Sequence, residues 1–465
     1  MPSQVQALVV GAGISGLTTA YALQTSGIST LVLETSSRPG GVIQSVERDG
    51  FLIECGPQSF SGNASITSIC RDLRILDQRI IAAPKAPRFV LLNRKLQNVP
   101  MGPGIFFSPF LAGGTSFAIL RDLFGTTHAP EPDESVADFI RRKFSSTFLD
   151  RLVGPFVSGI YAGDPEKLSL RAAFPILYEA EMAKGSILRG TLAVLKARRP
   201  KHPNTPRERP TLQTFREGND TLLRALANCL GDRLLLNSEV TCVAPLDPSH
   251  DANAPRFSVT VRTSRTEERV EAERLVLANS PAGAARVLSG LHPEFQSQLS
   301  TIEYAAVAVI SLGYRKSDVA NKLAGFGFLI PRSSGLNSLG SVWNSSLFPG
   351  RAPEGYALLT SFLGGVTNPA VLQKSPEEMV ALVHREIAPL LDIRNQPVFS
   401  NVTVWPRALP QYNLGHTARL AAVEKLRANF PGLHFAGNYL NGPAIGTCIE
   451  HALKVADEIR VSFAN

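Results

Sequence analysis

The chain has 465 residues, of which 44% are hydrophobic and 18% are charged. This composition is typical of a globular protein with well-buried cores in two or three domains, and it argues against large-scale disorder. Lys and Arg (47) outnumber Asp and Glu (39), and the formal net charge of +8 suits an acidic ligand, an anionic membrane or nucleic acid equally well. Charge alone therefore selects no partner.

The five cysteines are widely spaced, which predicts neither a zinc site nor a disulfide framework and fits a reducing, cytoplasmic setting. The first residues lack the basic and apolar pattern of a secretory signal. No apolar run approaches the roughly 20 residues of a membrane-spanning helix. We expect no metal site, and we expect any membrane contact to be peripheral, on the inner face of the cell membrane. The cysteines are Cys55, Cys70, Cys229, Cys242 and Cys448.

Residues 6–34 predict a βαβ unit, because a buried apolar run gives way to helical spacing and then returns. A GxGxxG motif follows the first strand, and Glu34 ends the second. Glycines permit a tight turn close to a pyrophosphate, the helix N-terminus offers free N–H groups, and the acidic side chain accepts hydrogen bonds from a ribose. The sequence therefore predicts a dinucleotide site at Gly11, Ala12, Gly13, Ile14, Ser15, Gly16 and Glu34.

The next residues favour FAD over NAD. SSRPGG follows the acidic position and resembles the second signature of flavoproteins of the glutathione-reductase and amine-oxidase type. Near the C-terminus, HFAGNYLNGPAIGTCIEHAL predicts a strand, a glycine-rich turn and a helix, and resembles the late flavin-contacting motif of the same proteins. These two segments add Thr35, Arg38, Gly40, Gly41, Val42, Gly437, Asn438, Ile445, Gly446 and Thr447 to the predicted cofactor contacts.

The segments after the first domain predict a hairpin, an apolar tract and then helices. APRFVLLNRKLQNVP predicts the hairpin, and residues 105–124 suit a surface-seeking loop and helix. Helical patterns run from Ser135 to about Ala197 and end in an exposed Pro-, Lys- and Arg-rich loop at residues 196–209. The apolar tract contains Phe106, Phe107, Phe110 and Phe117.

The second half of the chain predicts mostly strands. TFREGNDTLLRALANCL predicts a helix, and RLLLNSEVTCVAP, RFSVTVRT and ERLVLANSP predict strands. AAVAVISLGY and YALLTSFLGG predict further strands, with a helix at SPEEMVALVHREIAPLL. We expect an α/β protein in which a glutathione-reductase-type (Rossmann-like) FAD domain carries an inserted mixed-sheet substrate domain and a helical membrane-associating subdomain. The expected ranges are 1–85, 211–290 and 400–465 for the FAD domain, 86–100 and 291–399 for the substrate domain, and 101–210 for the helical subdomain.

A series of segments resembles the oxygen-dependent protoporphyrinogen oxidases, in the same order and over nearly the whole chain. These segments are ECGPQSF, APRFVLL, FVSGIYAGDPEKLSLRAAFP, GFGFLIP, SLGSVWNSSLFPGRAP, LLTSFLGG, VTVWPRALPQYNLGH and FAGNYLNGPAIG. The resemblance implies oxidation of protoporphyrinogen IX to protoporphyrin IX with non-covalent FAD and O2, release of hydrogen peroxide, and a place in haem biosynthesis. It implies that flavin N5 takes the hydride. No catalytic side chain is assigned.

The resemblance also assigns substrate contacts by position. Arg88 pairs with a propionate, and Leu329 and Phe362 clamp a pyrrole ring. Val342 stands where a larger aliphatic residue is common, which leaves the pocket volume open. Gly159 and the neighbouring Gly163 bring bare backbone close to the macrocycle. Further cofactor contacts are implied at Gly56, Pro57, Gln58, Ser59, Val240 and Trp405.

The insoluble product of the family suggests a purpose for the apolar tract at residues 105–124 and the basic loop, and we favour contact with an anionic membrane surface. A homodimer and contact with the next enzyme of haem synthesis stay open. Nucleic-acid binding is not expected, because the basic cluster lacks interleaved aromatic residues. His434 and His451 are assigned no acid–base role.

Four alternatives stay open. Within the family, the substrate can be coproporphyrinogen III rather than protoporphyrinogen IX. The chain can also be a flavin amine oxidase, although residues 400–440 contain no cysteine for a covalent flavin. A carotenoid desaturase acts on an uncharged polyene and does not require Arg88. The last alternative is a flavoprotein without catalytic activity.

Overall fold

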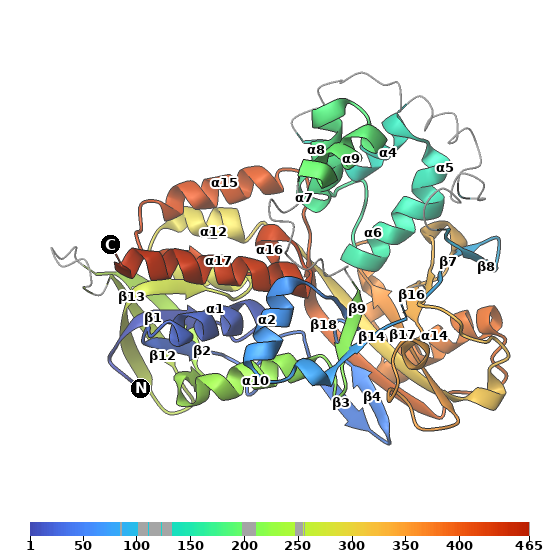
Figure 1. Cartoon of the computed structure of the whole chain (residues 1–465), viewed down its shortest axis with the longest axis horizontal. Helices are drawn as coiled ribbons and strands as arrows, with labels where there is room; N and C mark the ends of the chain where they lie inside the picture. Colours follow the sequence, from blue (N-terminus) through green and yellow to red (C-terminus); the bar gives the residue numbers. More distant parts are fainter. Residues whose placement is uncertain are drawn as a thin grey trace.

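The computed structural model describes residues 1–83, 86–100, 110, 122, 133–197, 211–246, 254 and 256–464. The described residues form two seven-stranded sheets that lie next to each other and a helical unit above their junction (Figure 1). The predicted apolar tract at 105–124 lies outside the described residues, apart from Phe110 and Asp122, as do residues 198–209 of the predicted basic loop.

The first sheet has the order β10-β2-β1-β13-β12-β11, with β19 also paired to β13. The pairs β2/β10, β1/β2, β1/β13 and β13/β19 are parallel, and β11 and β12 extend the sheet antiparallel. Carboxyl ends of parallel strands meet at one edge, so the segments after β1, β2, β13 and β19 lie together. The strands are β1 (Gln4–Val10), β2 (Thr30–Leu33), β10 (Leu234–Leu235), β11 (Glu239–Pro245), β12 (Phe257–Arg262), β13 (Glu267–Leu277) and β19 (Leu433–Phe435).

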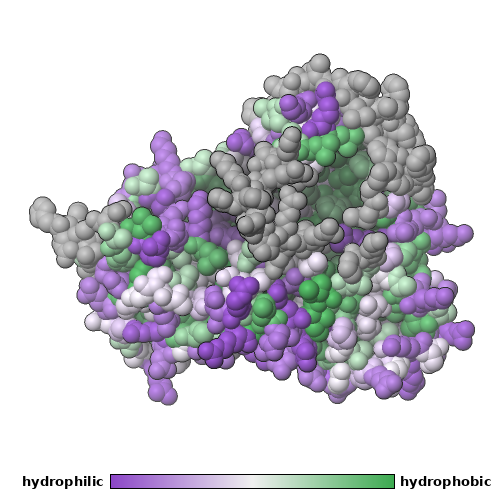
Figure 2. All heavy atoms as spheres, viewed as in Figure 1, coloured by the Kyte–Doolittle hydropathy of each residue, from purple (hydrophilic) through white to green (hydrophobic). Residues whose placement is uncertain are grey.

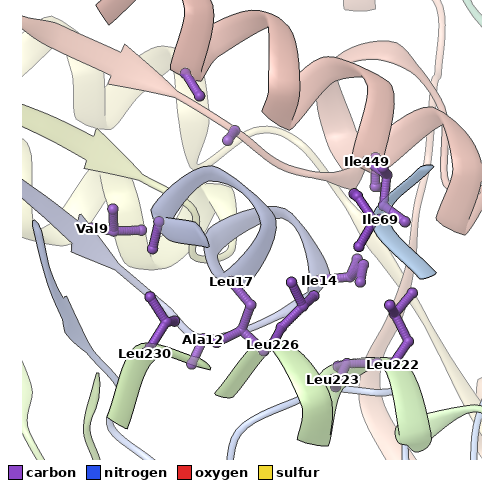
Figure 3. Packing of buried hydrophobic residues seen from close by; sticks show 14 of the residues in the cluster. Val9, Ala12, Ile14, Leu17, Ile69, Leu222, Leu223, Leu226, Leu230 and Ile449 are labelled. Carbon is purple, nitrogen blue, oxygen red and sulfur yellow. The ribbon is translucent and has the colours of Figure 1, made fainter. Parts of the chain in front are cut away.

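Helices cover both faces of this sheet. Successive side chains of β1 point to opposite faces, so both faces present apolar side chains that the helices bury. Ala7 and Val9 lie in one core cluster, and Leu8 and Val10 lie in the other. Figure 3 shows the first cluster, where Leu17 of α1 packs near residues of α10 and α17. The first face is covered by α1 (Ile14–Thr25), α10 (Asp220–Leu230) and α17 (Ile445–Ala464), the second by α11 (Pro281–Leu288), α12 (Pro293–Leu299) and α15 (His416–Arg427).

The second sheet has the order β18-β14-β17-β16-β15-β7-β8. Only β7 and β15 pair in parallel among its described strands. α14 (Pro376–Leu391) starts with a capping box of Ser375 and Glu378 and packs on one face of the sheet. The strands are β7 (Arg88–Leu92), β8 (Lys95–Asn98), β14 (Tyr304–Arg315), β15 (Gly327–Leu329), β16 (Ser338–Val342), β17 (Tyr356–Gly364) and β18 (Phe399–Pro410).

Smaller elements lie at the junction of the two sheets. They are a two-stranded sheet, a three-stranded sheet and three short helices. Their bounds are β3 (Ser45–Arg48) with β4 (Phe51–Glu54), then β5 (Phe60–Ser61), β9 (Leu212–Phe215) and β6 (Arg79–Ile81), and then α2 (Ala64–Asp72), α13 (Asn344–Leu347) and α16 (Asn438–Asn441).

The helical unit begins with α4 and ends with α9, where residues 135–197 had a helical pattern. Its core contains Phe139, Leu149 and Leu170, each at most 3% exposed. Among the described residues, no helix combines the length and apolar character needed to cross a membrane. The helices are α4 (Val136–Lys143), α5 (Ser146–Phe148), a π-helix (Leu149–Val153), α6 (Gly154–Tyr161), α7 (Leu170–Ala173), α8 (Pro175–Lys184) and α9 (Ile187–Ala197).

Two details differ from the sequence-based expectations. The helix predicted for TFREGNDTLLRALANCL is wrong at its start, because Thr214 and Phe215 belong to β9 and Gly218 takes a φ of +99° before α10 begins at Asp220. The second sheet also continues beyond residue 399, since β18 pairs with β14 along most of its length. The predicted hairpin is present as β7 and β8, and Asn93 and Arg94 at its turn both have positive φ.

Candidate active site

The glycine turn after β1 is tightly built against the first sheet. Gly11 has a φ of +102°, and a Cβ on Gly16 would overlap Gly11 O. Gly13 is the N-cap of α1, and no described atom lies within 4 Å of the position of a Cβ there. The first N–H groups of α1 are therefore available to an anion, with open space at Gly13. Ala12, Ile14 and Ser15 of the motif are buried.

Glu34 braces this turn. Its Oε2 accepts a hydrogen bond from Ala12 N at 2.7 Å, and its Oε1 accepts one from Ser36 N at 2.9 Å. Each carboxylate oxygen keeps a further lone pair for a ribose hydroxyl. Ser238 N donates to Glu34 O at 2.8 Å, which places the start of β11 beside it. Val240 on β11 is buried in the second core cluster, and Thr35 is exposed.

The Gly40–Gly41 loop lies against the glycine turn. Gly40 N donates to Ala12 O at 2.8 Å, and a Cβ on Gly41 would meet Gly13 Cα at 3.7 Å. Arg38 folds back on its own loop, where its Nη2 donates to Gly41 O at 2.6 Å. The Arg38 guanidinium also lies 5.9 Å from the ring centroid of Trp405. The structure thus brings the first and second predicted motifs together.

The turn at Gly56 completes this part of the site. A Cβ on Gly56 would overlap Val42 O. Gln58 is buried, and its Nε2 donates to Gly56 O at 2.8 Å and to Glu54 O at 3.0 Å. Trp405 Nε1 donates to Cys55 O at 2.6 Å. Pro57 and Ser59 are half-buried, and Pro57 O accepts a hydrogen bond from Asn219 Nδ2.

The C-terminal motif follows β19 at the same sheet edge. Ala436 N donates to Leu277 O at 2.9 Å, so Gly437 and Asn438 emerge beside the end of β13. A Cβ on Gly446 would lie 2.8 Å from Asn63 Nδ2. Ile445 is buried, and Thr447 is half-buried. All three predicted cofactor motifs therefore converge on one edge of the first sheet.

Three side chains that were not predicted hold this last motif. Tyr304 OH donates to Asn438 Oδ1 at 2.7 Å, and Tyr412 OH donates to Asn438 O. His416 Nε2 bonds Tyr439 O at 2.9 Å, and burial lowers the pKa of His416 to about 4. The imidazole is therefore neutral near pH 7 and donates through Nε2. Burial also lowers the pKa of His434 to about 4 and lowers that of His451.

The predicted substrate contacts of the second sheet share one face. Gly327 pairs with Arg88 on β7 and with Val342 on β16. Leu329, two residues along β15, pairs with Gly340, which pairs with Phe362 on β17. Cross-strand partners and residues two apart point to the same side of a sheet. Arg88, Val342, Leu329 and Phe362 therefore form one wall.

This wall continues to the cofactor loops. Phe362 pairs with Val309, which pairs with Thr403 on β18, and Trp405 lies two residues further along β18. The same sheet face thus extends from Arg88 to Trp405, whose indole N–H donates to Cys55 O. Arg88 is exposed, and its guanidinium lies 5.4 Å from the ring centroid of Phe326.

α6 of the helical unit packs against the wall. A Cβ on Gly159 would overlap Leu329 Cδ2, so the exposed backbone of Gly159 lies directly at the wall. Gly163 is buried away from it, and a Cβ there would lie 2.7 Å from Gln411 Oε1. Gly163 O accepts a hydrogen bond from Arg332 Nη2 at 2.6 Å. Figure 2 shows hydrophobic surface in a hollow beneath the helical unit.

These features fit a bound dinucleotide. A Cβ at Gly16 or Gly56 would overlap a backbone oxygen, and Gly11 takes a φ of +102° that other residues rarely adopt. Open space remains at Gly13, where helix N–H groups are free. A parallel sheet with such a turn, an acidic strand end and two further loops at its carboxyl edge defines a dinucleotide-binding oxidoreductase. The pattern of the family described as flavin containing amine oxidoreductase matches residues 14–460. The chain belongs to this family.

Known proteins with similar sequences or folds agree with this result. A chloroplastic protoporphyrinogen oxidase of Oryza sativa subsp. japonica is 36% identical over 97% of this chain and 87% of its own length. A coproporphyrinogen III oxidase of Bacillus subtilis (strain 168) is 28% identical over 98% of each chain. A solved structure from Exiguobacterium sp. 255-15, provisionally assigned as a protoporphyrinogen oxidase, has a TM-score of 0.79 at 21% identity and covers 99% of each chain. The predictions of an α/β flavoprotein fold of this type, of an oxidoreductase of this family and of its FAD cofactor are confirmed. The association of the helical subdomain with a membrane stays a prediction.

Proposed function

We propose that the protein oxidises protoporphyrinogen IX to protoporphyrin IX with bound FAD and O2 and releases hydrogen peroxide, in haem and tetrapyrrole biosynthesis. The observation that carries this proposal is the single sheet face that joins Arg88, Val342, Leu329 and Phe362 to Trp405 beside the cofactor loops. A continuous apolar wall with a guanidinium at one end suits a macrocycle that has an apolar body and carboxylate arms. The similarity to the rice enzyme supports the same reading.

Positioning is the main task of these residues. The Arg88 guanidinium holds a propionate through paired hydrogen bonds, which fixes the rotation of the macrocycle in its plane. Leu329 and Phe362 contact a pyrrole ring, and the bare backbone of Gly159 lets the ring approach α6. When bound, FAD supplies the hydride acceptor. No side chain is needed as a nucleophile.

The residues proposed to hold FAD divide by the part of the cofactor they meet. The N-terminus of α1 would hold the pyrophosphate, and Glu34 would accept hydrogen bonds from the adenosine ribose. Arg38, the Gly40–Gly41 loop and the Gly56–Gln58 turn follow the cofactor towards the second sheet. The N-terminus of α17 offers N–H groups where negative charge develops on reduction.

Coproporphyrinogen III is the second candidate substrate, since a relative is named for its oxidation. It carries two more propionates where protoporphyrinogen IX has vinyl groups. The proposed wall joins three apolar side chains to one guanidinium, which suits the substrate with fewer charged arms. Amine oxidation and carotenoid desaturation are not favoured, because the similar sequences are porphyrinogen oxidases.

Steady-state oxidation of both porphyrinogens by the purified holoenzyme tests the proposal. We expect turnover of protoporphyrinogen IX with a higher kcat/KM than that of coproporphyrinogen III, with one hydrogen peroxide formed for each two-electron step. Flavin absorbance recorded under anaerobic conditions should bleach when substrate is added. A flavin that stays oxidised with both porphyrinogens would refute the function.

Contact with one face of a membrane is also proposed, because helices of the helical unit carry exposed apolar side chains. Met182 on α8 is 46% exposed and Leu192 on α9 is 71% exposed. Such side chains enter the boundary between headgroups and acyl chains. Co-sedimentation with anionic lipid vesicles tests this proposal, and equal recovery of the protein with and without vesicles would oppose it.

A further inference from the structure

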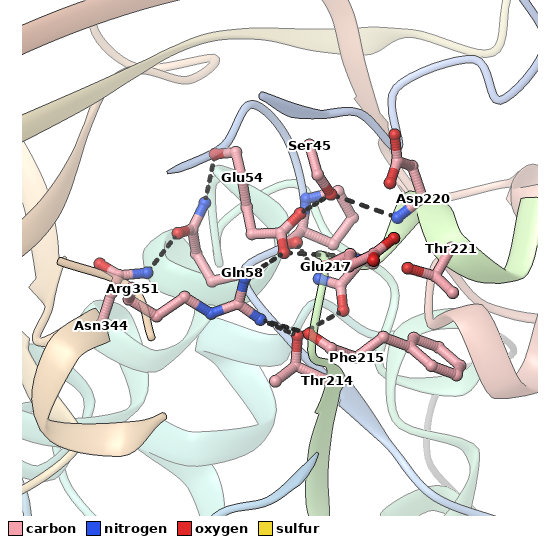
Figure 4. Close-up of polar contacts among 12 residues, drawn as sticks. Ser45, Glu54, Gln58, Thr214, Phe215, Glu217, Asp220, Thr221, Asn344 and Arg351 are labelled. Carbon is pink, nitrogen blue, oxygen red and sulfur yellow. Dashed lines mark hydrogen bonds and ion pairs between the residues drawn. The ribbon is translucent and has the colours of Figure 1, made fainter. Parts of the chain in front are cut away.

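The segment Glu54–Gln58 belongs to the first domain but is bonded by three side chains from the second-sheet region. Trp405 Nε1 donates to Cys55 O at 2.6 Å, and Asn344 Nδ2 donates to Gln58 Oε1 at 2.7 Å. Arg351 Nη1 lies 3.4 Å from Glu54 Oε1. Figure 4 shows the last two contacts side by side, with Asn344 at the start of α13 and Arg351 in the loop that follows this helix.

Further hydrogen bonds anchor the ends of this network. Arg351 Nη2 donates to Thr214 Oγ1 and, at 2.9 Å, to Phe215 O. Glu54 accepts hydrogen bonds from Ser45 Oγ at 2.6 Å and from Asn219 N at 3.0 Å. The carboxyl group is therefore approached from three separate segments of the chain, by Ser45, Asn219 and Arg351, and its position is determined from several directions.

Gln58 has no freedom to turn its amide. Its Nε2 bonds two carbonyl oxygens of its own segment, Glu54 O and Gly56 O, while its Oε1 accepts from Asn344. Asn344 Oδ1 is buried and has no hydrogen-bond partner among the described residues. A buried amide normally has all of its polar atoms paired. The acceptor of Asn344 is therefore available to a donor of a bound molecule.

A buried ion pair gives little net stability, because the loss of hydration offsets the attraction between the charges. Glu54 and Arg351 each have about 2% of their side chain exposed. A positioning role explains the Glu54–Arg351 pair better than a stabilising role, since the pair fixes the turn in which Gly56 already touches the backbone of Val42. Such a support shell holds a site within the tolerance that a reaction requires.

We propose that Asn344 and Arg351 are positioning residues for the flavin: through Gln58 and Glu54 they set the Gly56–Gln58 turn, so that the substrate wall and the flavin keep one relative position. This inference rests on the proposed function only in placing the flavin beside this turn. The residues that line the substrate wall and those that hold the turn are then joined through α13, which begins two residues after Val342.

The test compares Asn344→Leu and Gln58→Leu, alone and together, in the purified holoenzyme. Release of FAD on dilution is followed by fluorescence, and the visible flavin spectrum is recorded. Asn344→Leu should weaken FAD binding about fivefold, as expected for one lost hydrogen bond. Gln58→Leu should weaken it more, because it also removes the bonds to Glu54 O and Gly56 O. Both variants should shift the flavin bands. The double variant should weaken FAD binding no more than Gln58→Leu alone, because the bond between Asn344 and Gln58 is already lost in that single variant.

Arg351 is tested with Arg351→Met and the conservative Arg351→Lys. We expect the lysine variant to restore part of the FAD affinity and of the wild-type spectrum that the methionine variant loses. If Arg351→Met does not fold, the asparagine and glutamine variants still decide the matter. Retention of wild-type affinity and spectrum in Asn344→Leu would overturn the proposal.

Glu181→Gln is the matched control. Glu181 is also a fully buried carboxylate, with its Oε1 2.7 Å from Lys143 Nζ and 2.8 Å from Arg142 Nη1, but it lies in the helical unit. It should lower the melting temperature without changing the flavin spectrum or the FAD affinity by more than about twofold. If Glu181→Gln weakened FAD binding as much as Asn344→Leu does, the effect of Asn344→Leu would be one of general destabilisation. These readouts need no porphyrinogen, so they stand even if the proposed substrate is wrong.

Discussion

Glu54 Oε1 and Arg351 Nη1 lie 3.4 Å apart where the two sheets meet, and about 2% of each side chain is exposed. Burial raises the pKa of Glu54 to about 7, an effect that Arg351 counteracts and Asp220 reinforces. Burial also lowers the pKa of Arg351, although a guanidinium keeps its charge in proteins. The charge of this network therefore changes close to neutral pH, through the carboxyl group.

The first prediction concerns stability and pH. The unfolded carboxyl titrates near 4.5, so the folded state binds more protons than the unfolded state between about pH 4.5 and 7, and this part of the stability is lost as pH rises through that window. Relative to Glu54→Gln, the wild type should lose roughly 3 kcal/mol of unfolding free energy across it. Denaturant unfolding of both proteins at closely spaced pH values measures the difference. Parallel pH profiles would contradict the raised pKa.

The second prediction separates two glycines of one turn. A Cβ on Gly16 would overlap Gly11 O, whereas a Cβ on Gly13 has no described neighbour within 4 Å. Gly16→Ala should therefore lower the stability of the FAD-free protein by about 1–3 kcal/mol and abolish FAD retention. Gly13→Ala should leave the FAD-free protein as stable as the wild type but weaken FAD binding. Thermal unfolding with and without FAD distinguishes them. Equal FAD affinity in Gly13→Ala and the wild type would place the pyrophosphate elsewhere.

The sequence was informative where a function depends on neighbouring residues. The glycine turn and Glu34 lie within one βαβ unit, so their spacing predicted that they meet, whereas the resemblance to a flavoprotein signature assigned the Gly40–Gly41 loop to the same site. The common face of Arg88, Leu329, Val342 and Phe362 depends on strand register, and only the family resemblance led to those positions. Their roles as contacts stay predictions.

Residues that act across long separations could not be predicted. Asn344 and Gln58 are 286 residues apart, the first on α13 and the second in the turn between β4 and β5. Neither SLGSVWNSSLFPGRAP nor ECGPQSF carries a periodicity or spacing that indicates the other as its partner. Tyr304 is similar: it starts a strand that reads as ordinary core, and only the folded chain brings its hydroxyl to Asn438. The start of a helix is also hard to predict from sequence, because β9 ends inside the segment TFREGN that the pattern assigned to a helix.

The third prediction concerns that hydroxyl. Tyr304→Phe removes the donor to Asn438 Oδ1 and leaves a partly buried acceptor without this bond. The loss of one such bond costs about 1 kcal/mol, so FAD affinity should fall about fivefold. Tyr314→Phe is the control, because it removes a comparable hydroxyl, 3.1 Å from His384 Nδ1, on the α14 side of the second sheet. FAD titration of both variants measures the two affinities. A loss of affinity of the same size in both would show that the effect is not local to Asn438.

The fourth prediction concerns Arg88, which the sheet register places at one end of the apolar wall. Arg88→Ala removes a hydrogen-bonded charge from the proposed propionate site. Such a bond contributes about 1.5–3 kcal/mol, so KM for protoporphyrinogen IX should rise roughly 10-fold to 100-fold, with FAD retained. Arg88→Lys should recover part of the loss, because an ammonium keeps the charge but not the paired geometry.

Lys95→Ala supplies the control for Arg88, since Lys95 is an exposed cation on β8 of the same hairpin. It changes the net charge equally, so a general electrostatic effect would raise KM in both variants, whereas a specific contact raises it only for Arg88→Ala. The rise should also shrink when the substrate is replaced by a porphyrinogen with esterified propionates, which has no carboxylate for a guanidinium to bind. Unchanged turnover of the natural substrate by Arg88→Ala would remove the carboxylate anchor from the proposed site and revive an uncharged substrate, such as the polyene of a carotenoid desaturase.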